Sequence, residues 1–342
     1  MGVVGIGWER PLHQAGSGVD VAVGSGTLVV HERNTRLVGL DPEDGSVRWD
    51  VATGRWLRAM SVAGQRLLVL PQSTDELACL DLATGRDVWR VGLRRWTGHL
   101  VVDGDLVLVG GWRGYTPLRA VDVATGRTLW EAEHDVRTVR PAAGGGGFLV
   151  GEPGGARVRL IDRRDGRELR AWSLPHPLAD HDHEAAFTAV GGDRFLVRCG
   201  EDAVVRIEPS TGAVSGLVLA GTPLVASAPR HVGGLLWLGE RGTGFTVADP
   251  HDGRVLWRIA VRPAPFGQVV ADDRGRGDGF VLADAGGFLV FVDPRGQVVE
   301  RVGITRRIRA LRRLGPGRVL VITKGTLLAA ALGDGARHDD RS

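Results

Sequence analysis

Short apolar runs alternate with glycine-rich polar turns along the whole chain. One unit recurs: an apolar stretch that ends at an acid, a turn with a glycine, and a second stretch that follows the turn. The seven leading acids are Asp41, Asp81, Asp122, Asp162, Glu208, Asp249 and Asp293. Their successive spacings are 40, 41, 40, 46, 41 and 44 residues. A strand pattern with a period of ~40–45 residues is typical of the blades of a β-propeller.

The turn in each copy predicts a β-hairpin. In six copies the glycine stands four residues after the acid, as Gly85 follows Asp81. The carboxylate can accept hydrogen bonds from amides of the turn, and glycine adopts the positive φ that the turn requires. In the last copy Gly296 stands three residues after Asp293, so we expect a different turn there. For the second blade the pattern predicts four strands, at residues 58–62, 66–70, 76–81 and 87–91.

The two ends of the chain determine the predicted number of blades. Trp8 lies in a segment that resembles the tryptophan strand of the repeat, but the first strand of its hairpin does not precede it. Residues 318–332 resemble that first part of the hairpin, but no tryptophan strand follows them. One blade made from both fragments would close the ring and leave no exposed sheet edge. We therefore predict an all-β protein, a single eight-bladed β-propeller of four-stranded blades over residues 1–333. Residues 334–342 are expected to be a polar tail.

Tryptophan occupies a fixed place in four copies, eight residues after the acid: Trp49, Trp89, Trp130 and Trp257. The copy that runs from Ala120 through Asp122, Thr125 and Gly126 to Trp130 resembles the repeat of the pyrroloquinoline-quinone (PQQ)-like propellers, Ala-x-Asp-x-x-Thr-Gly-x-x-x-Trp. The resemblance covers essentially the whole chain. It implies that these tryptophans dock one blade onto the next.

The resemblance raises the question of a PQQ cofactor. The quinoprotein dehydrogenases of this fold bind PQQ with calcium, and they are longer, usually exported chains, many with a disulfide between adjacent cysteines. Here the two cysteines, Cys79 and Cys199, are far apart in sequence and are expected to be buried thiols. We therefore expect no cofactor.

The composition of the chain limits the kinds of partner that we expect it to bind. Of 43 basic residues only Lys324 is a lysine, as expected of a GC-rich, bacterial genome, and the net charge is only +3. This small excess does not favour nucleic acid as a partner. The amino terminus shows no secretory signal, and no stretch reaches ~18 apolar residues. We expect a cytoplasmic monomer that does not bind membranes.

The candidate ligand site combines arginine and aromatic side chains. The loops that enter the innermost strands should share a face with those that join the second and third strands, around the mouth of the central channel. The predicted ligand-binding residues are Trp56, Arg58, Arg95, Trp96, His99, Trp112, Arg137 and Phe266. Guanidinium groups bind carboxylate or phosphate, and indole offers a stacking face. The alternative is a solvated, arginine-rich rim.

The densest cluster of titratable groups lies in an insertion of the fifth blade, residues 176–184. His181, Asp182 and His183 are its candidate catalytic residues, for acid–base chemistry. On an extended chain His181 and His183 would face the same way, but a metal needs a third ligand and none is evident, so we predict no metal. The alternative is a solvated polar loop.

Two functions stay open at this level. The first is a non-catalytic propeller that binds a small anionic or aromatic ligand, or a protein or peptide partner. The second is an enzyme without a redox cofactor that acts on a small metabolite or modified peptide, with the histidines and Asp182 as acid–base groups.

Overall fold

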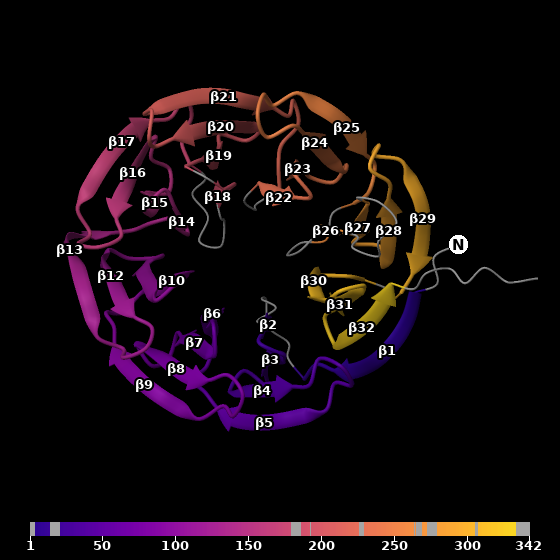
Figure 1. Ribbon diagram of the computed structural model, residues 1–342, viewed down its shortest axis with the longest axis horizontal. Coiled ribbons are helices and arrows are strands. Elements are labelled where there is room, and N and C mark those ends of the chain that lie inside the picture. The colour runs from indigo at the N-terminus through magenta and orange to yellow at the C-terminus, as the bar shows by residue number, and fades with distance from the viewer. Residues whose placement is uncertain are drawn as a thin grey trace, which may run out of the picture.

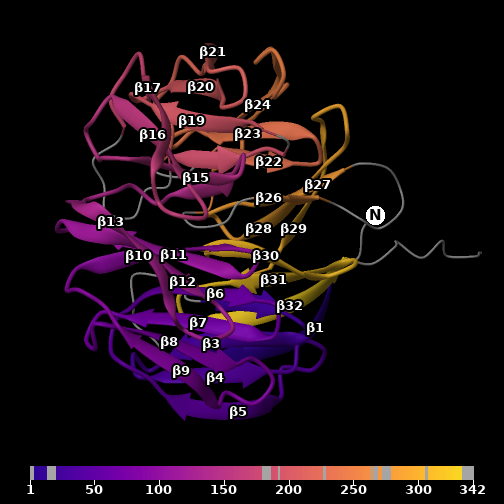
Figure 2. The ribbon, with the colours of Figure 1, turned by 60° about the vertical axis from the view of Figure 1, so that its left-hand side comes forward.

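The protein is a closed ring of eight antiparallel, four-stranded sheets (Figures 1 and 2). The computed structural model describes residues 4–13, 21–178, 186–191, 193–225, 229–262, 264, 269–271, 279–304 and 307–332. None of these residues belongs to a helix, and accordingly none belongs to an apolar helix long enough to cross a membrane. The predicted eight-bladed, all-β propeller is confirmed.

Each blade runs from an innermost strand to an outermost strand in chain order. The first blade contains β2 (Val21–Gly24), β3 (Thr27–Glu32), β4 (Arg36–Leu40) and β5 (Val47–Ala52). The second contains β6 (Leu57–Ala63), β7 (Arg66–Pro71), β8 (Glu76–Asp81) and β9 (Asp87–Gly92). The third contains β10 (Thr97–Asp103), β11 (Leu106–Gly111), β12 (Thr116–Asp122) and β13 (Thr128–Val136). The fourth contains β14 (Ala142–Gly144), β15 (Gly147–Gly151), β16 (Arg157–Asp162) and β17 (Glu168–Ser173).

The second half of the ring follows the same order. The fifth blade contains β18 (Phe187–Ala189), β19 (Phe195–Cys199), β20 (Ala203–Glu208) and β21 (Ala213–Leu219). The sixth contains β22 (Arg230–Val232), β23 (Leu235–Gly239), β24 (Phe245–Ala248) and β25 (Val255–Ile259). The seventh contains β26 (Val269–Ala271), β27 (Phe280–Ala283), β28 (Phe288–Val292) and β29 (Val298–Gly303). The eighth contains β30 (Ala310–Gly315), β31 (Arg318–Ile322), β32 (Thr326–Leu332) and β1 (Val4–Pro11).

The eighth blade joins the two ends of the chain, as predicted. β1 pairs antiparallel with β32, and Trp8 lies opposite Ala329. An ion pair between Arg10 Nε and Glu32 Oε1, 3.1 Å long, links this blade to the first. Because β1 is the fourth strand of this sheet, the eighth blade is as complete as the other seven and the ring closes.

The turns have the predicted chemistry. Asp122 Oδ1 accepts hydrogen bonds from the Thr125 hydroxyl at 2.6 Å and the Thr125 amide at 2.7 Å. These bonds lower the pKa of the Asp122 carboxyl. Gly126 has a φ of 74°, which glycine adopts without steric cost. In the last copy Asp293 Oδ1 accepts bonds from the amides of Arg295 and Gln297, so this turn differs, as expected.

Adjacent blades meet through the tryptophans of the outermost strands. Trp49 Nε1 donates to the carbonyl of Leu82 in the next blade at 3.0 Å, and its indole packs so closely on Gly85 that a Cβ there would lie 2.6 Å from the ring. Trp130 makes the equivalent bond to Arg163 at 2.9 Å. In the fourth blade Arg170 stands at the tryptophan position, and its Nη1 donates to the Pro209 carbonyl at 2.7 Å.

The apolar core lies between the blades. The middle strands β3 and β11 are buried along their whole length, because each packs against a neighbouring blade on both faces. Cys79 and Cys199 are buried thiols, as predicted, and burial raises the pKa of Cys79 to about 11. Neither is therefore activated as a nucleophile.

Candidate functional site

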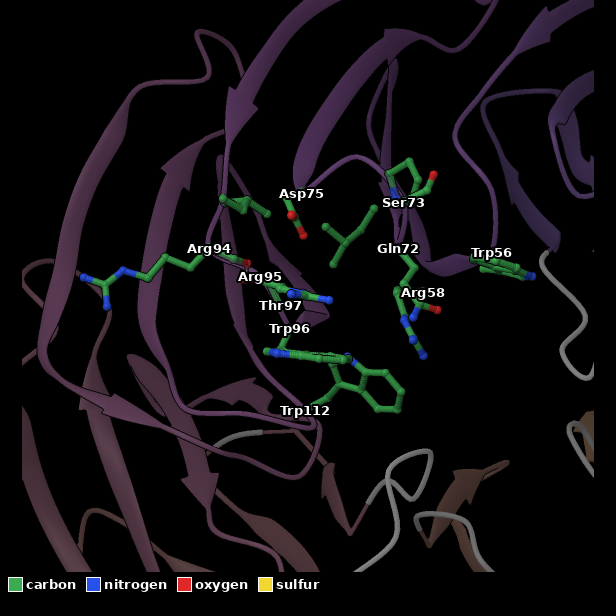
Figure 3. A pocket seen from close by; sticks show the side chains of 13 residues that line it. Trp56, Arg58, Gln72, Ser73, Asp75, Arg94, Arg95, Trp96, Thr97 and Trp112 are labelled. Atoms are coloured by element: carbon green, nitrogen blue, oxygen red, sulfur yellow. Dashed lines mark hydrogen bonds between the residues drawn. The ribbon is translucent and has the colours of Figure 1, made fainter.

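A pocket of about 370 Å³ lies between the second and third blades (Figure 3). Five of the eight predicted ligand-binding residues line it: Trp56, Arg58, Arg95, Trp96 and Trp112. The other lining residues are Leu70, Pro71, Gln72, Ser73, Asp75, Leu93, Arg94 and Thr97. They come from the segments before β6 and β10 and from the ends of β7 and β11. The loops predicted to share one face thus do lie together.

Trp56 and Trp96 occupy equivalent places in consecutive blades, immediately before the innermost strands. Both have a left-handed backbone, with φ of 53° and 73°. Such a conformation is strained for a bulky side chain, and strain of this kind concentrates at functional sites. Both indoles are exposed, at 56% and 38%. The repeat itself does not require a tryptophan at either place.

Hydrogen bonds to neighbouring loops hold these strained residues. The Trp56 amide donates to Asn34 Oδ1 in the first blade at 3.0 Å, and the Trp56 carbonyl accepts from the Gln72 amide at 2.9 Å. The Trp96 carbonyl accepts from the Trp112 amide at 3.2 Å. The backbone at both tryptophans is therefore held in place by neighbouring segments before any ligand binds.

A β-bulge stands at the start of the innermost strand in both blades. The pairing register shifts between Leu57 and Ala59 in β6, and between Thr97 and His99 in β10. A bulge redirects the side chain of its extra residue. In the second blade that residue is Arg58, and in the third blade it is Gly98.

The two bulges together position Trp112. A Cβ on Gly98 would lie 2.1 Å from Trp112 Cδ1, so only glycine leaves room for this indole. Trp112 is 3% exposed. Arg58 Cζ lies 3.5 Å from the ring centroid of Trp112, and Arg113 Cζ lies 4.4 Å from it. A buried cation–π contact of this kind is worth about 2 kcal/mol and orients the Arg58 guanidinium.

Arginine side chains and one acidic side chain line the pocket. Figure 3 shows Arg58 and Arg95 directed into it, whereas Arg94 points away, toward Glu131, whose Oε1 lies 3.8 Å from Arg94 Nη2. Arg95 Cζ lies 5.0 Å from the Trp96 ring centroid. Asp75 lies on the opposite side of Arg95 from Trp96 in this view. The arrangement offers an anion two guanidinium groups, an N–H donor one carboxylate, and a planar group two exposed indoles.

The remaining predicted residues lie elsewhere. His99 is 7% exposed, and its Nε2 lies 2.6 Å from the Thr138 carbonyl oxygen, so it packs inside the third blade. Arg137 Nε donates to the Trp112 carbonyl at 3.2 Å and supports that residue without lining the pocket. Phe266, His181, Asp182 and His183 lie outside the described residues. Within the described residues, no cluster of three potential ligands could hold a metal ion.

The polar residues of the pocket wall, Gln72, Ser73, Asp75 and Thr97, were not predicted from the sequence. Only arginine and aromatic residues were selected from the loops of this face. A sequence signal existed for Asp75, because the polar run of residues 72–75 between two apolar strands is typical of a turn. In the structure Asp75 lies in the loop between β7 and β8, with a φ of 48°.

Comparisons with known proteins bear on the fold of the propeller and not on the pocket. No curated protein matches the chain significantly. Among solved structures, BamB from Moraxella catarrhalis superposes with a TM-score of 0.72 at 16% identity, over 96% of this chain and 100% of that one. A europium-containing methanol dehydrogenase superposes with a TM-score of 0.67 at 12% identity, over 96% and 93% of the two chains. The computationally designed protein Ika8 gives 0.70 at 16% identity, over 92% and 95%. These identities establish a shared fold alone.

A match to a family model identifies the family of the chain as well as its fold. The family model described as outer membrane protein assembly factor BamB matches residues 5–74, 73–214 and 154–336, which together reach all eight blades. The chain therefore belongs to the BamB-like family of PQQ-like β-propellers.

Proposed function

We propose that this protein is a non-catalytic binding propeller that recognises an acidic peptide segment of a partner protein in the pocket between the second and third blades. The observation that carries the proposal is the pair of strained, exposed indoles of Trp56 and Trp96, next to Arg58 and Arg95. The repeat requires neither tryptophan, and both indoles are exposed, so their presence needs an explanation beyond stability.

Several features support a peptide rather than a bare anion. Tryptophan, tyrosine and arginine dominate the energetically important positions of protein interfaces. Tyr115, in the loop after Trp112, adds a third exposed aromatic side chain at 64% exposure. A peptide can present carboxylates to Arg58 and Arg95 and an amide N–H to Asp75. The family is described by an assembly factor, a name that is consistent with protein binding.

Selection of peptides tests this function without knowledge of the natural partner. Random twelve-residue peptides displayed on phage are selected on the immobilised protein, and enriched sequences are synthesised. We expect peptides rich in aspartate or glutamate next to an aromatic or apolar residue. Trp96→Ala and Arg95→Gln should each weaken binding of such a peptide roughly 10- to 100-fold, because each removes a central contact of about 1.5–3 kcal/mol.

The matched controls lie in the fourth blade, outside the pocket. Arg157→Gln removes a charge from an exposed side chain of the fourth blade, and Leu169→Ala removes an exposed apolar one. Both should leave the affinity unchanged. Equal binding by the pocket variants and the controls, or enrichment of no acidic sequence, would contradict the proposal.

A small planar anion is the second candidate occupant. The size of the pocket favours it, because a cavity of about 370 Å³ lies within the range of small-molecule sites, ~300–1,000 Å³. An aromatic carboxylate could stack on Trp96 and pair with Arg95. Titration of the protein with indole-3-acetate and benzoate, followed by calorimetry, separates the cases: saturable binding that Trp96→Ala abolishes favours a small molecule.

A further inference from the structure

Asp75 is the only acid among the described residues that line the pocket between the second and third blades. It lies in the loop that joins β7 to β8, and its side chain is exposed. Figure 3 shows its carboxylate directed toward the pocket, which the guanidinium groups of Arg58 and Arg95 also enter. The pocket therefore presents charges of both signs to a ligand.

The fold uses the backbone of Asp75 but not its side chain. The Asp75 carbonyl accepts a hydrogen bond from the Leu93 amide at 2.8 Å, which attaches the loop to the segment that leads to β10. Other blades make the equivalent bond with the residue six positions before the leading acid, and there the carbonyl belongs to Thr35, Ala156 or Gly287. Because these residues carry no charge, the loop forms without a carboxylate at this place.

Asp75 and Arg95 line the same pocket but do not neutralise each other. Within the part of the chain that the structure describes, neither side chain forms an ion pair. Glu76, the next residue along the chain, does form one, because its Oε2 lies 3.4 Å from Arg90 Nη1. The pocket thus holds an acid and a base apart, and a ligand that carries both charges can pair with each of them.

We infer that the pocket recognises a segment with charges of both signs, in which an acid pairs with Arg95 and a lysine or arginine pairs with Asp75. The inference rests on the function proposed above and specifies its ligand. A segment with acids alone would place like charges near Asp75 and would cover this carboxylate without a counter-charge. A basic side chain removes both costs and adds charge-assisted hydrogen bonds.

The arrangement of the pocket also predicts an order of residues in the segment. In the view of Figure 3, Arg95 lies between Asp75 and Trp96. The acid that pairs with Arg95 should therefore lie between the basic residue and an aromatic or apolar residue that contacts Trp96. Such a segment differs from the purely acidic ones that Arg58 and Arg95 alone would favour.

A double-mutant cycle with phage-selected peptides tests the inference. The enriched peptides are synthesised with acetylated amino termini, so that a side chain supplies any cation, and they should carry a lysine or arginine near the acid. Replacement of this basic residue with glutamine should weaken binding to the wild-type protein roughly 3- to 10-fold, as for a partly covered ion pair. Asp75→Asn should weaken binding of the unchanged peptide by the same factor. The glutamine peptide should bind Asp75→Asn and the wild-type protein equally.

Two controls separate recognition from folding. Asp75 has a φ of 48°, a conformation that asparagine also adopts, so Asp75→Asn should leave the melting temperature unchanged. Glu76→Gln removes an acid that stands next in sequence but does not line the pocket, and this variant should bind both peptides as the wild-type protein does.

The outcomes distinguish this inference from the function on which it rests. Acidic peptides without a basic residue that bind through Trp96 and Arg95, and that Asp75→Asn binds equally well, would overturn the inference and leave the proposed function in place. Enrichment of no peptide, or binding that neither Arg95→Gln nor Asp75→Asn changes, would overturn both. If Asp75→Asn weakens the unchanged peptide and the glutamine peptide equally, the inference is overturned and Asp75 is a positioning residue of its loop.

Discussion

At the scale of single residues, backbone conformation distinguishes the tryptophans of the pocket from those of the scaffold. Trp49 and Trp130 lie in the outermost strands β5 and β13, are 8% exposed and donate to the neighbouring blade. Trp56 and Trp96 have positive φ and exposed indoles. The same residue type thus stabilises the ring at one position and is held at a conformational cost at the other.

This conformational cost predicts that, at Trp56, the glycine variant is more stable than the alanine variant, which is the reverse of the usual order. A left-handed backbone costs about 1–2 kcal/mol for any residue with a Cβ, but not for glycine. Trp56→Gly should therefore be more stable than Trp56→Ala by about 1 kcal/mol. At Val214 of β21, which pairs with Ile207 of β20, the glycine variant should be the less stable one, as is usual in a strand. Chemical denaturation of the four variants measures both differences, and the usual order at Trp56 would show that its backbone is not strained.

At the scale of elements, the repeat predicted the strands well because each turn carries its own chemistry. In the second blade the predicted strands agree with β6–β9 to within one residue at each end. The site was harder to predict, because a bulge reverses the inward and outward alternation that follows it. Gly98 could have marked the bulge of β10, because glycine inside a strand often does so, whereas Arg58 gives no sign of the bulge of β6. His99, predicted as a ligand-binding residue, follows the bulge of β10 and is buried instead.

Contacts between adjacent blades predict a large effect at Trp130. Its indole is buried on Gly166 of the next blade, and its Nε1 donates to the Arg163 carbonyl. Trp130→Ala should lower the free energy of unfolding by about 3–5 kcal/mol, as for other large buried aromatics. Its neighbour Leu129 is 43% exposed, so Leu129→Ala should change stability by less than about 0.5 kcal/mol. Equal effects in urea denaturation would contradict a docking role for Trp130.

At the scale of the whole molecule, one strand closes the ring. β1 supplies the outermost strand of a blade whose other three strands lie at the opposite end of the chain. Trp8 of this strand donates from Nε1 to the Pro42 carbonyl of the first blade at 3.1 Å. The closure thus joins three segments that are far apart in sequence.

Removal of residues 1–11 should expose the edge of β32 and leave the interface with the first blade incomplete. An unpaired strand edge promotes association with other chains. We expect this variant to melt at a lower temperature and to elute as oligomers in size-exclusion chromatography. A synthetic peptide of residues 4–11 should restore the monomeric species, whereas a scrambled peptide should not. A monomeric truncated protein of unchanged stability would show that β1 does not hold the ring closed.

We propose the pocket between the second and third blades as the recognition site of this propeller. A crystal structure of the protein with a selected acidic peptide tests this proposal most directly. We expect peptide density between Trp56 and Trp96, with a carboxylate of the peptide paired to Arg58 or Arg95. Peptide density on another face, with these four side chains uncontacted, would contradict it.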